Sequence, residues 1–258
     1  MLKKLLKYDL KSLFKSIIPL FLFSIISLAI FLFTKLFDNY SIFNIISGIF
    51  NLLFIVSLLA ILFASFFISI KRFYQNVLKD EGYLTNTLPV KKSSIVLSKL
   101  LSSAILMIVS ALVCFLLTWA SDFNNYDFSS LFEEIYPGFY GYTMALIVCA
   151  VIFFQTLALI SAFYSSLSIG YSFNNHKNKK SILAGIVTYI LMQVITIASI
   201  VLLLYSFDVA VVYTETTDLE SIKLAVYILL LAMGLNIFYT IVNYLISTKM
   251  LDKKLNLE

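Results

Sequence analysis

The sequence has few of the residues from which disulfide-rich domains and metal sites are built. Its 258 residues include two cysteines, one histidine, three prolines and seven glycines. Cys114 and Cys149 both fall inside apolar runs, so we expect unpaired thiols and no disulfide framework. His176 stands among Asn and Lys residues with no Cys or carboxylate cluster nearby, so we expect no metal site.

Charged residues are scarce as well. They make up 13% of the chain against 61% hydrophobic residues, and the mean hydropathy is +0.97. Soluble domains contain about 25% charged and about 45–50% apolar residues. A soluble core of this size cannot hide such an excess, so most of the chain must lie in lipid. The net charge of +5 therefore concerns the two sides of a membrane, and we expect no nucleic-acid partner.

Motifs for catalysis and nucleotide binding are missing. No GxxxxGK[ST], HExxH or GxSxG pattern occurs, and the glycines are too scattered for a dinucleotide fingerprint. The long apolar stretches carry no Asp, Glu, Lys, Arg or His at mid-depth, although ion-coupled carriers usually need such a group. We therefore expect that the chain is not an enzyme and has no cofactor of its own. Energy for any uphill transport would come from another subunit.

What the sequence does contain is a series of six apolar stretches. Each reaches the roughly 20 residues that cross ~30 Å of hydrocarbon, and a backbone in lipid must satisfy its own hydrogen bonds. The sequence therefore predicts an all-α polytopic membrane protein with a single transmembrane domain over residues 1–258. The predicted helices cover residues 17–36, 45–70, 95–119, 142–169, 182–207 and 222–248.

The distribution of basic residues predicts the orientation. Seventeen of the nineteen Lys and Arg residues lie in the N-terminal segment, the 71–99 loop, the 170–181 loop and the tail. Only Lys35 and Lys223 lie on the other side, where nine of the fourteen acidic residues also fall, several in an outer loop at 120–141. The positive-inside rule places the basic side, and with it both termini, in the cytoplasm.

Residues 1–16 precede the first predicted span and form an amphipathic pattern. Leucines fall on one half of a helical wheel and Lys4, Lys7, Lys11 and Lys15 on the other, with Asp9 interrupting the apolar half. This pattern predicts an interfacial helix that lies along the inner leaflet and turns its lysines toward anionic lipid headgroups.

The longest polar interval runs from Lys71 to Lys99 and lies between the second and third predicted spans. After Asp80, Glu81 and Gly82, a short apolar stripe ends at Pro89, because helices usually stop before a proline. Its apolar face must lie flat on the membrane or meet a partner. The residues of this stripe are Tyr83, Leu84, Thr87 and Leu88.

Residues 79–101, KDEGYLTNTLPVKKSSIVLSKLL, resemble the corresponding loop of ABC-2 type transporter permeases. That loop has an acidic residue and a glycine, a short helix, a Pro-Val step and a lysine that opens the third span. The residues that match this pattern are Glu81, Gly82, Leu88, Pro89, Val90 and Lys99. The six-span arrangement and the amphipathic N-terminal helix are also similar to that family.

The resemblance implies a mechanism and a set of partners. In such permeases the loop is a coupling helix that seats in a groove of a separate ATP-binding subunit, which carries ATP and Mg. A second permease copy or a homologous permease completes the assembly in the bacterial plasma membrane. By this resemblance Tyr83, Leu84, Thr87 and Leu88 would form the docking face, Lys79 and Glu81 would orient it, and Pro89 would end it.

The resemblance leaves the substrate open. An interior without charge favours an amphipathic substrate, such as an antimicrobial or other membrane-active peptide or a drug. Export of a lipid, a glycan or sodium is the alternative within transport, and a non-transporting membrane sensor or scaffold is the alternative outside it. Uncharged polar residues in the spans either form hydrogen bonds between helices or line a pathway. The candidate pathway residues are Asn44, Asn51, Gln155, Gln193, Asn236 and Asn243.

Overall fold

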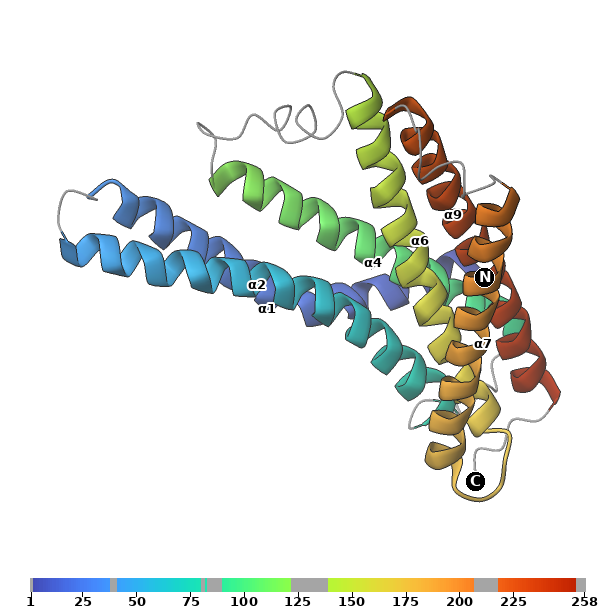
Figure 1. Cartoon of the computed structure of the whole chain (residues 1–258). Helices are drawn as coiled ribbons and strands as arrows, with labels where there is room; N and C mark the ends of the chain where they lie inside the picture. The colour runs from blue at the N-terminus through green and yellow to red at the C-terminus, as the bar shows by residue number, and fades with distance from the viewer. Residues whose placement is uncertain are drawn as a thin grey trace. The chain divides into compact units, whose positions relative to one another are not determined.

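The computed structural model describes residues 2–37, 41–79, 82, 90–121, 139–206 and 218–253. Within these ranges the regular structure is entirely helical, with no strand. Figure 1 shows the long helices and their labels. The helices in chain order are α1 (Leu2–Lys35), α2 (Ser41–Phe73), the π-helix η1 (Tyr74–Leu78), α4 (Lys92–Ser121), α6 (Phe139–Gly170), α7 (Lys177–Ser206) and α9 (Asp218–Lys253).

The prediction of six long apolar helices is confirmed. Six helices in the described part of the chain are long and apolar enough to span a bilayer. The shortest of the six long α-helices, α4 and α7, have 30 residues, or about 45 Å at ~1.5 Å per residue. They are therefore longer than the ~30 Å hydrocarbon layer. Both ends of α4 lie outside its predicted span, and α7 begins several residues before its own. The predicted outer loop at 120–141 falls largely outside the described residues.

The chain divides into two compact units. The first comprises Met1–Phe73 and Leu97–Asp127, and the second comprises Tyr74–Val96 and Phe128–Glu258. One boundary falls where α2 passes without a break into η1, and another falls inside α4. The interval between the second and third spans therefore belongs to the same unit as α6, α7 and α9.

The first unit is held together by a small apolar core. Leu13 and Ile17 of α1 contact Ile61 of α2 and Leu106 of α4, and each of these side chains is at most 1% exposed. Leu13 and Ile17 are four residues apart, so they lie on one face of α1. This spacing explains why one stripe of α1 is buried while its neighbours remain exposed.

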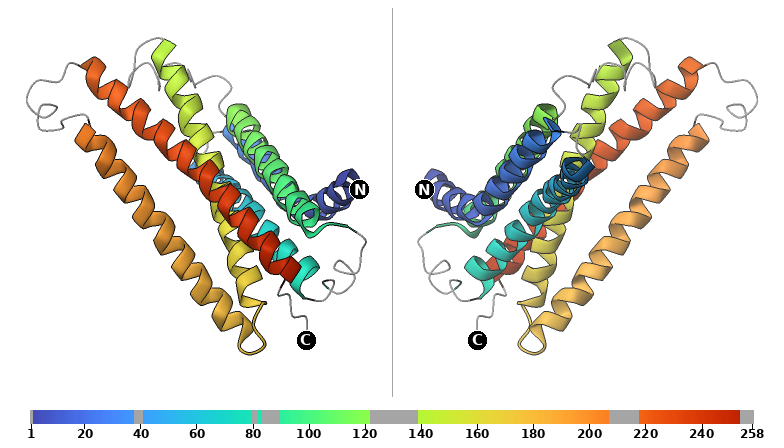
Figure 2. Two further views of the ribbon diagram at one scale, coloured as in Figure 1. Left: turned by 90° about the vertical axis from the view of Figure 1, so that its right-hand side faces the viewer. Right: turned by 90° about the vertical axis from the view of Figure 1, so that its left-hand side faces the viewer.

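The N-terminal segment forms one helix with the first span. Residues 1–16 and 17–36 were predicted as separate elements, but α1 runs from Leu2 to Lys35 with Pro19 inside it. Figure 2 shows that the first turns of α1 run in a different direction from the rest. A proline removes a backbone hydrogen bond and kinks a helix, which accounts for the bend. The lysines at positions 3, 4, 7, 11 and 15 are exposed, as the amphipathic pattern predicts. Contact with lipid headgroups stays a prediction.

The second unit is built around α6, which packs against both α7 and α9. At the turn between α6 and α7 the backbones of the two helices approach closely. A Cβ atom at Gly170 would lie 2.5 Å from the backbone nitrogen of Ser181, whereas one at Gly185 would lie at an ordinary 3.6 Å from Ser166. Small residues let the backbones of neighbouring helices approach, so Gly170 fixes how closely α6 and α7 meet.

Candidate functional site

The predicted docking helix lies mostly outside the described residues. Those positions are Glu81, Tyr83, Leu84, Thr87, Leu88 and Pro89. Lys79 is described and exposed, and its backbone N–H donates to the carbonyl of Tyr74 at 3.1 Å. This bond spans five residues and closes the π-turn. The docking face stays a prediction, but the structure describes both of its flanks.

The N-terminal flank of the loop is η1, which continues α2 without a break but in a π conformation. Such short π segments are rare and often occur at functional sites. Asn76 in this turn is 6% exposed, and its side-chain oxygen is buried with no hydrogen-bond donor. Leaving a buried acceptor unpaired costs ~1–3 kcal/mol. The π-turn is therefore a high-energy feature next to the loop.

A tyrosine pair ties this flank to the turn between α6 and α7. The Tyr171 hydroxyl donates to the Tyr74 hydroxyl at 3.0 Å, and the two rings meet edge to face with centroids 5.9 Å apart. The Asn178 side-chain oxygen lies 3.4 Å from the same Tyr171 hydroxyl. Burial raises the pKa of Tyr171 above its usual range, and the hydrogen bond with Tyr74 raises it further. Tyr171 thus stays protonated at neutral pH.

The C-terminal flank of the loop is tied to α9. The Tyr244 hydroxyl donates to the backbone carbonyl of Ser93 at 3.2 Å, across 151 positions of sequence. Ser93 lies in the first turn of α4, in the part that belongs to the second unit. Both flanks of the loop are therefore bonded to the bundle of α6, α7 and α9.

The first unit contains a buried ion pair that the sequence analysis did not anticipate. The Lys99 ammonium pairs with the Asp9 carboxylate, and the Ser98 hydroxyl donates to the other oxygen of Asp9 at 3.1 Å. Asp9 and Lys99 are 4% and 5% exposed. The sequence analysis took Asp9 as a break in an apolar face and Lys99 as a motif residue. Two features of the sequence could have indicated this pair. Asp9 lies on the leucine face of its helix, and Lys99 lies within an apolar stretch.

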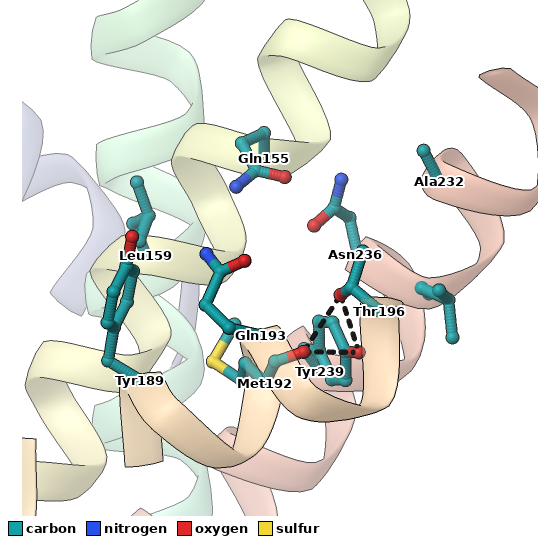
Figure 3. Close-up of a pocket in the computed structure, with 10 residues that line it drawn as sticks. Gln155, Leu159, Tyr189, Met192, Gln193, Thr196, Ala232, Asn236 and Tyr239 are labelled. Carbon is teal, nitrogen blue, oxygen red and sulfur yellow. Dashed lines mark hydrogen bonds between the residues drawn. The ribbon is translucent and has the colours of Figure 1, made fainter. Parts of the chain in front are cut away.

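Three of the six candidate pathway residues meet in the second unit. Gln155 of α6, Gln193 of α7 and Asn236 of α9 line one cavity of about 60 Å³. Figure 3 shows their side-chain amides directed toward a common gap. Each lies near the middle of its candidate span. The remaining lining residues are Leu159, Tyr189, Met192, Thr196, Ala232, Leu235 and Tyr239.

Asn236 differs from the other two amides in its burial. Its side chain is 4% exposed, whereas Gln155 is exposed and Gln193 is half-buried. Its amide has no hydrogen-bond partner among the residues that the structure describes. The amide faces the cavity, so it can pair with a polar group that enters there.

The other three candidates do not line the cavity. The amide oxygen of Asn243 accepts a hydrogen bond from Ser165 at 3.0 Å, and its nitrogen lies 3.9 Å from the sulfur of Met192. This is the helix-bridging role that was the alternative to a pathway. Asn44 and Asn51 lie on α2 in the first unit and are exposed.

One wall of the cavity is held by a hydroxyl cluster that connects α7 and α9. The Tyr239 hydroxyl donates to the backbone carbonyl of Met192 at 3.0 Å and lies 2.9 Å from the hydroxyl of Thr196, as Figure 3 shows. Thr196 also donates to the same carbonyl at 2.8 Å. Neither Tyr239 nor Met192 was expected from the sequence to take part in a site. A single tyrosine within an apolar span carries no pairing signal.

Among the described residues no group of three or more His, Cys, Asp or Glu side chains is placed to hold a metal ion. Both cysteines are free, with Cys114 half-buried and Cys149 exposed. Comparison with known proteins found no matching family model, no matching curated protein and no matching solved structure.

Proposed function

We propose that this chain is the membrane subunit of an ATP-driven exporter that moves an amphipathic substrate, such as a membrane-active peptide or a drug. A separate ATP-binding subunit, which carries ATP and Mg, docks on residues 79–89 and drives the movement. A second permease chain completes the pathway. The resemblance of residues 79–101 to the coupling loop of ABC-2 type permeases suggests this function.

The observation that carries the proposal is the attachment of the loop at both ends. Tyr74 on one flank is bonded to Tyr171, and Ser93 on the other flank is bonded to Tyr244. A loop that merely rests on lipid has no need of two such ties. A loop that is pushed by a partner needs them, because the push must reach the helices as a rigid-body movement.

The same two contacts define the route of that movement. Tyr171 directly follows α6 and precedes α7, and Tyr244 lies on α9. A displacement of the loop is therefore passed to the three helices that surround the polar cavity. In this proposal the cavity is a stage of the substrate pathway, and the loop moves its walls.

The test is purification of the tagged full-length chain from its native membrane. We expect the wild type to bring with it a P-loop subunit and ATP hydrolysis. Leu84→Asp or Leu88→Asp places a charge on the docking face and should remove both. Thr85→Asp introduces the same charge in the same loop away from that face, so the subunit and its activity should remain.

Two results would count against the proposal. One is a wild-type preparation with no ATPase subunit after mild solubilisation. The other is full retention of the subunit by both leucine variants. Thermal unfolding of each variant, measured in the same detergent, separates a lost interface from a lost fold.

A further inference from the structure

The cavity between α6, α7 and α9 contains polar groups of one chemical kind. Gln155, Gln193 and Asn236 each present an amide, which both donates and accepts hydrogen bonds. No charged side chain is among the described residues that line it. A cation would meet amide N–H groups as well as oxygens, and an anion would find no basic partner. The lining therefore favours a neutral group that both donates and accepts.

The size of the cavity limits what can enter. One buried water needs roughly 10–15 Å³, so a cavity of about 60 Å³ accepts more than one water but not a whole drug-sized molecule. Leu159, Ala232 and Leu235 supply apolar walls beside the amides. Such a site fits one polar group carried on an apolar chain.

Asn236 provides the independent sign of a ligand. It is buried to more than nine-tenths, directed into the cavity and without a hydrogen-bond partner among the described residues. The side chain of Asn243, which lies on the same helix, contacts Ser165 through its oxygen and Met192 through its nitrogen. The contrast separates an amide that holds helices together from one that is available for recognition.

We infer that this cavity is a recognition site for a secondary amide, the peptide group of an apolar peptide. Asn236 donates to its carbonyl and accepts from its N–H, and Gln155 and Gln193 complete the pairing. The role of this site in export rests on the proposed function, but binding itself does not. The site rejects an ester of the same shape, because an ester lacks the N–H and leaves an amide oxygen of the site unpaired.

Binding can be tested without an ATPase. The full-length chain in phosphatidylcholine nanodiscs is dialysed to equilibrium against radiolabelled N-methyl-4-methylpentanamide, which carries a single secondary amide on an apolar chain, with empty nanodiscs as the blank for partition into lipid. The matched probe is methyl 4-methylpentanoate, which has no N–H. We expect saturable binding of the amide and roughly tenfold weaker binding of the ester, which corresponds to about 1.4 kcal/mol.

Variants then assign the effect to the site. Asn236→Leu keeps a side chain of similar size and should lower amide binding to the level of the ester. Asn44→Leu removes an exposed amide from α2 in the first unit and should leave binding unchanged. Thermal unfolding confirms that both variants are folded, and Asn236→Gln provides a second, conservative variant that should retain part of the preference.

Three results would overturn the inference. They are equal binding of amide and ester by the wild type, undiminished binding by a folded Asn236→Leu chain, and no saturable binding of either probe, which would make this a site for water alone. A wild-type preparation that has no ATPase subunit but still binds the amide would refute the exporter and leave this site standing. Retention of the ATPase without amide binding would do the reverse.

Discussion

Asp9 of α1 and Lys99 of α4 form an ion pair inside the first unit, and both side chains are almost completely buried. Asp9 lies four residues before Leu13, so the acid continues the buried stripe that also contains the apolar core. Desolvation of two charges is tolerated only when they are paired and further hydrogen-bonded, and Ser98 supplies the additional donor. The pair therefore fixes the register of α1 against α4.

The first prediction concerns this pair. Lys99→Met leaves the Asp9 carboxylate buried without its cation, so we expect a loss of ~3–5 kcal/mol in the free energy of unfolding. The double variant Asp9→Asn with Lys99→Met removes the unpaired charge and should recover at least half of that loss. Lys11→Met, which removes an exposed lysine of the same helix, should change little. Unfolding by titration with SDS in mixed micelles measures all three. A double variant no more stable than Lys99→Met would refute the pairing.

The second prediction concerns the close turn between α6 and α7. Gly170→Ala places a Cβ against the backbone of Ser181, and overpacking of this kind costs ~1–3 kcal/mol. Gly234→Ala meets open space in α9, so it should be neutral or slightly stabilising because alanine favours a helix. Thermal unfolding in detergent compares the two. Equal melting temperatures would show that α6 and α7 are not as close as described.

The third prediction concerns the pH dependence of stability. The pKa of Tyr171 is raised in the folded protein, so the fold binds this proton more tightly than the unfolded chain does. Its contribution to stability is complete below about pH 10 and is lost as the pH rises above that value. At neutral pH the Tyr171→Phe variant should have a free energy of unfolding ~1 kcal/mol below that of the wild type, because it lacks the bond to Tyr74. Above about pH 10 its free energy of unfolding should fall less than that of the wild type.

Tyr205→Phe is the control for this measurement, since Tyr205 is 86% exposed. It should follow the wild-type curve of unfolding free energy against pH. A Tyr171→Phe curve parallel to that of the wild type above about pH 10 would contradict the raised pKa.

The fourth prediction concerns orientation. In a chain without Cys114 and Cys149, a cysteine introduced at Ser129 should react with an impermeant maleimide added to whole cells. A cysteine in place of Lys179, which is exposed at the start of α7, should react only after permeabilisation. These outcomes follow from the excess of basic residues on one side. The opposite pattern of labelling would invert the assignment of both termini.

The helices were predictable from sequence because the length of each apolar run determines them. An apolar run of sufficient length must form a helix in lipid, and no knowledge of its neighbours is required. The ends were less accurate, since polar residues such as those at 177–181 and Lys249, Asp252 and Lys253 remain helical. Their helical state depends on continuation of the hydrogen-bond ladder and not on hydropathy.

The polar contacts were predictable only in part. The amides at 155, 193 and 236 were recognised as unusual, but their convergence depends on how three helices are rotated about their axes. Asn44 and Asn51 have the same spacing as Asn236 and Asn243, yet the first two are exposed and the last two are buried. Spacing defines a shared face, and only packing decides what that face meets. The bond between Tyr74 and Tyr171 joins residues 97 positions apart, and no local pattern encodes it.

The division of the chain also has a consequence for its synthesis. Residues 74–96 leave the ribosome long before α9, but they belong to the unit that α9 completes. Ser93 can form its hydrogen bond only after Tyr244, 151 positions later in the sequence, has been synthesised. The first unit, by contrast, has all of its helices once α4 has been made. Because domains tend to fold in the order of synthesis, we expect the first unit to assemble early. The flank at Ser93 acquires its partner only at the end, so a nascent chain truncated before α9 would present a loop tied only through Tyr74 and Tyr171.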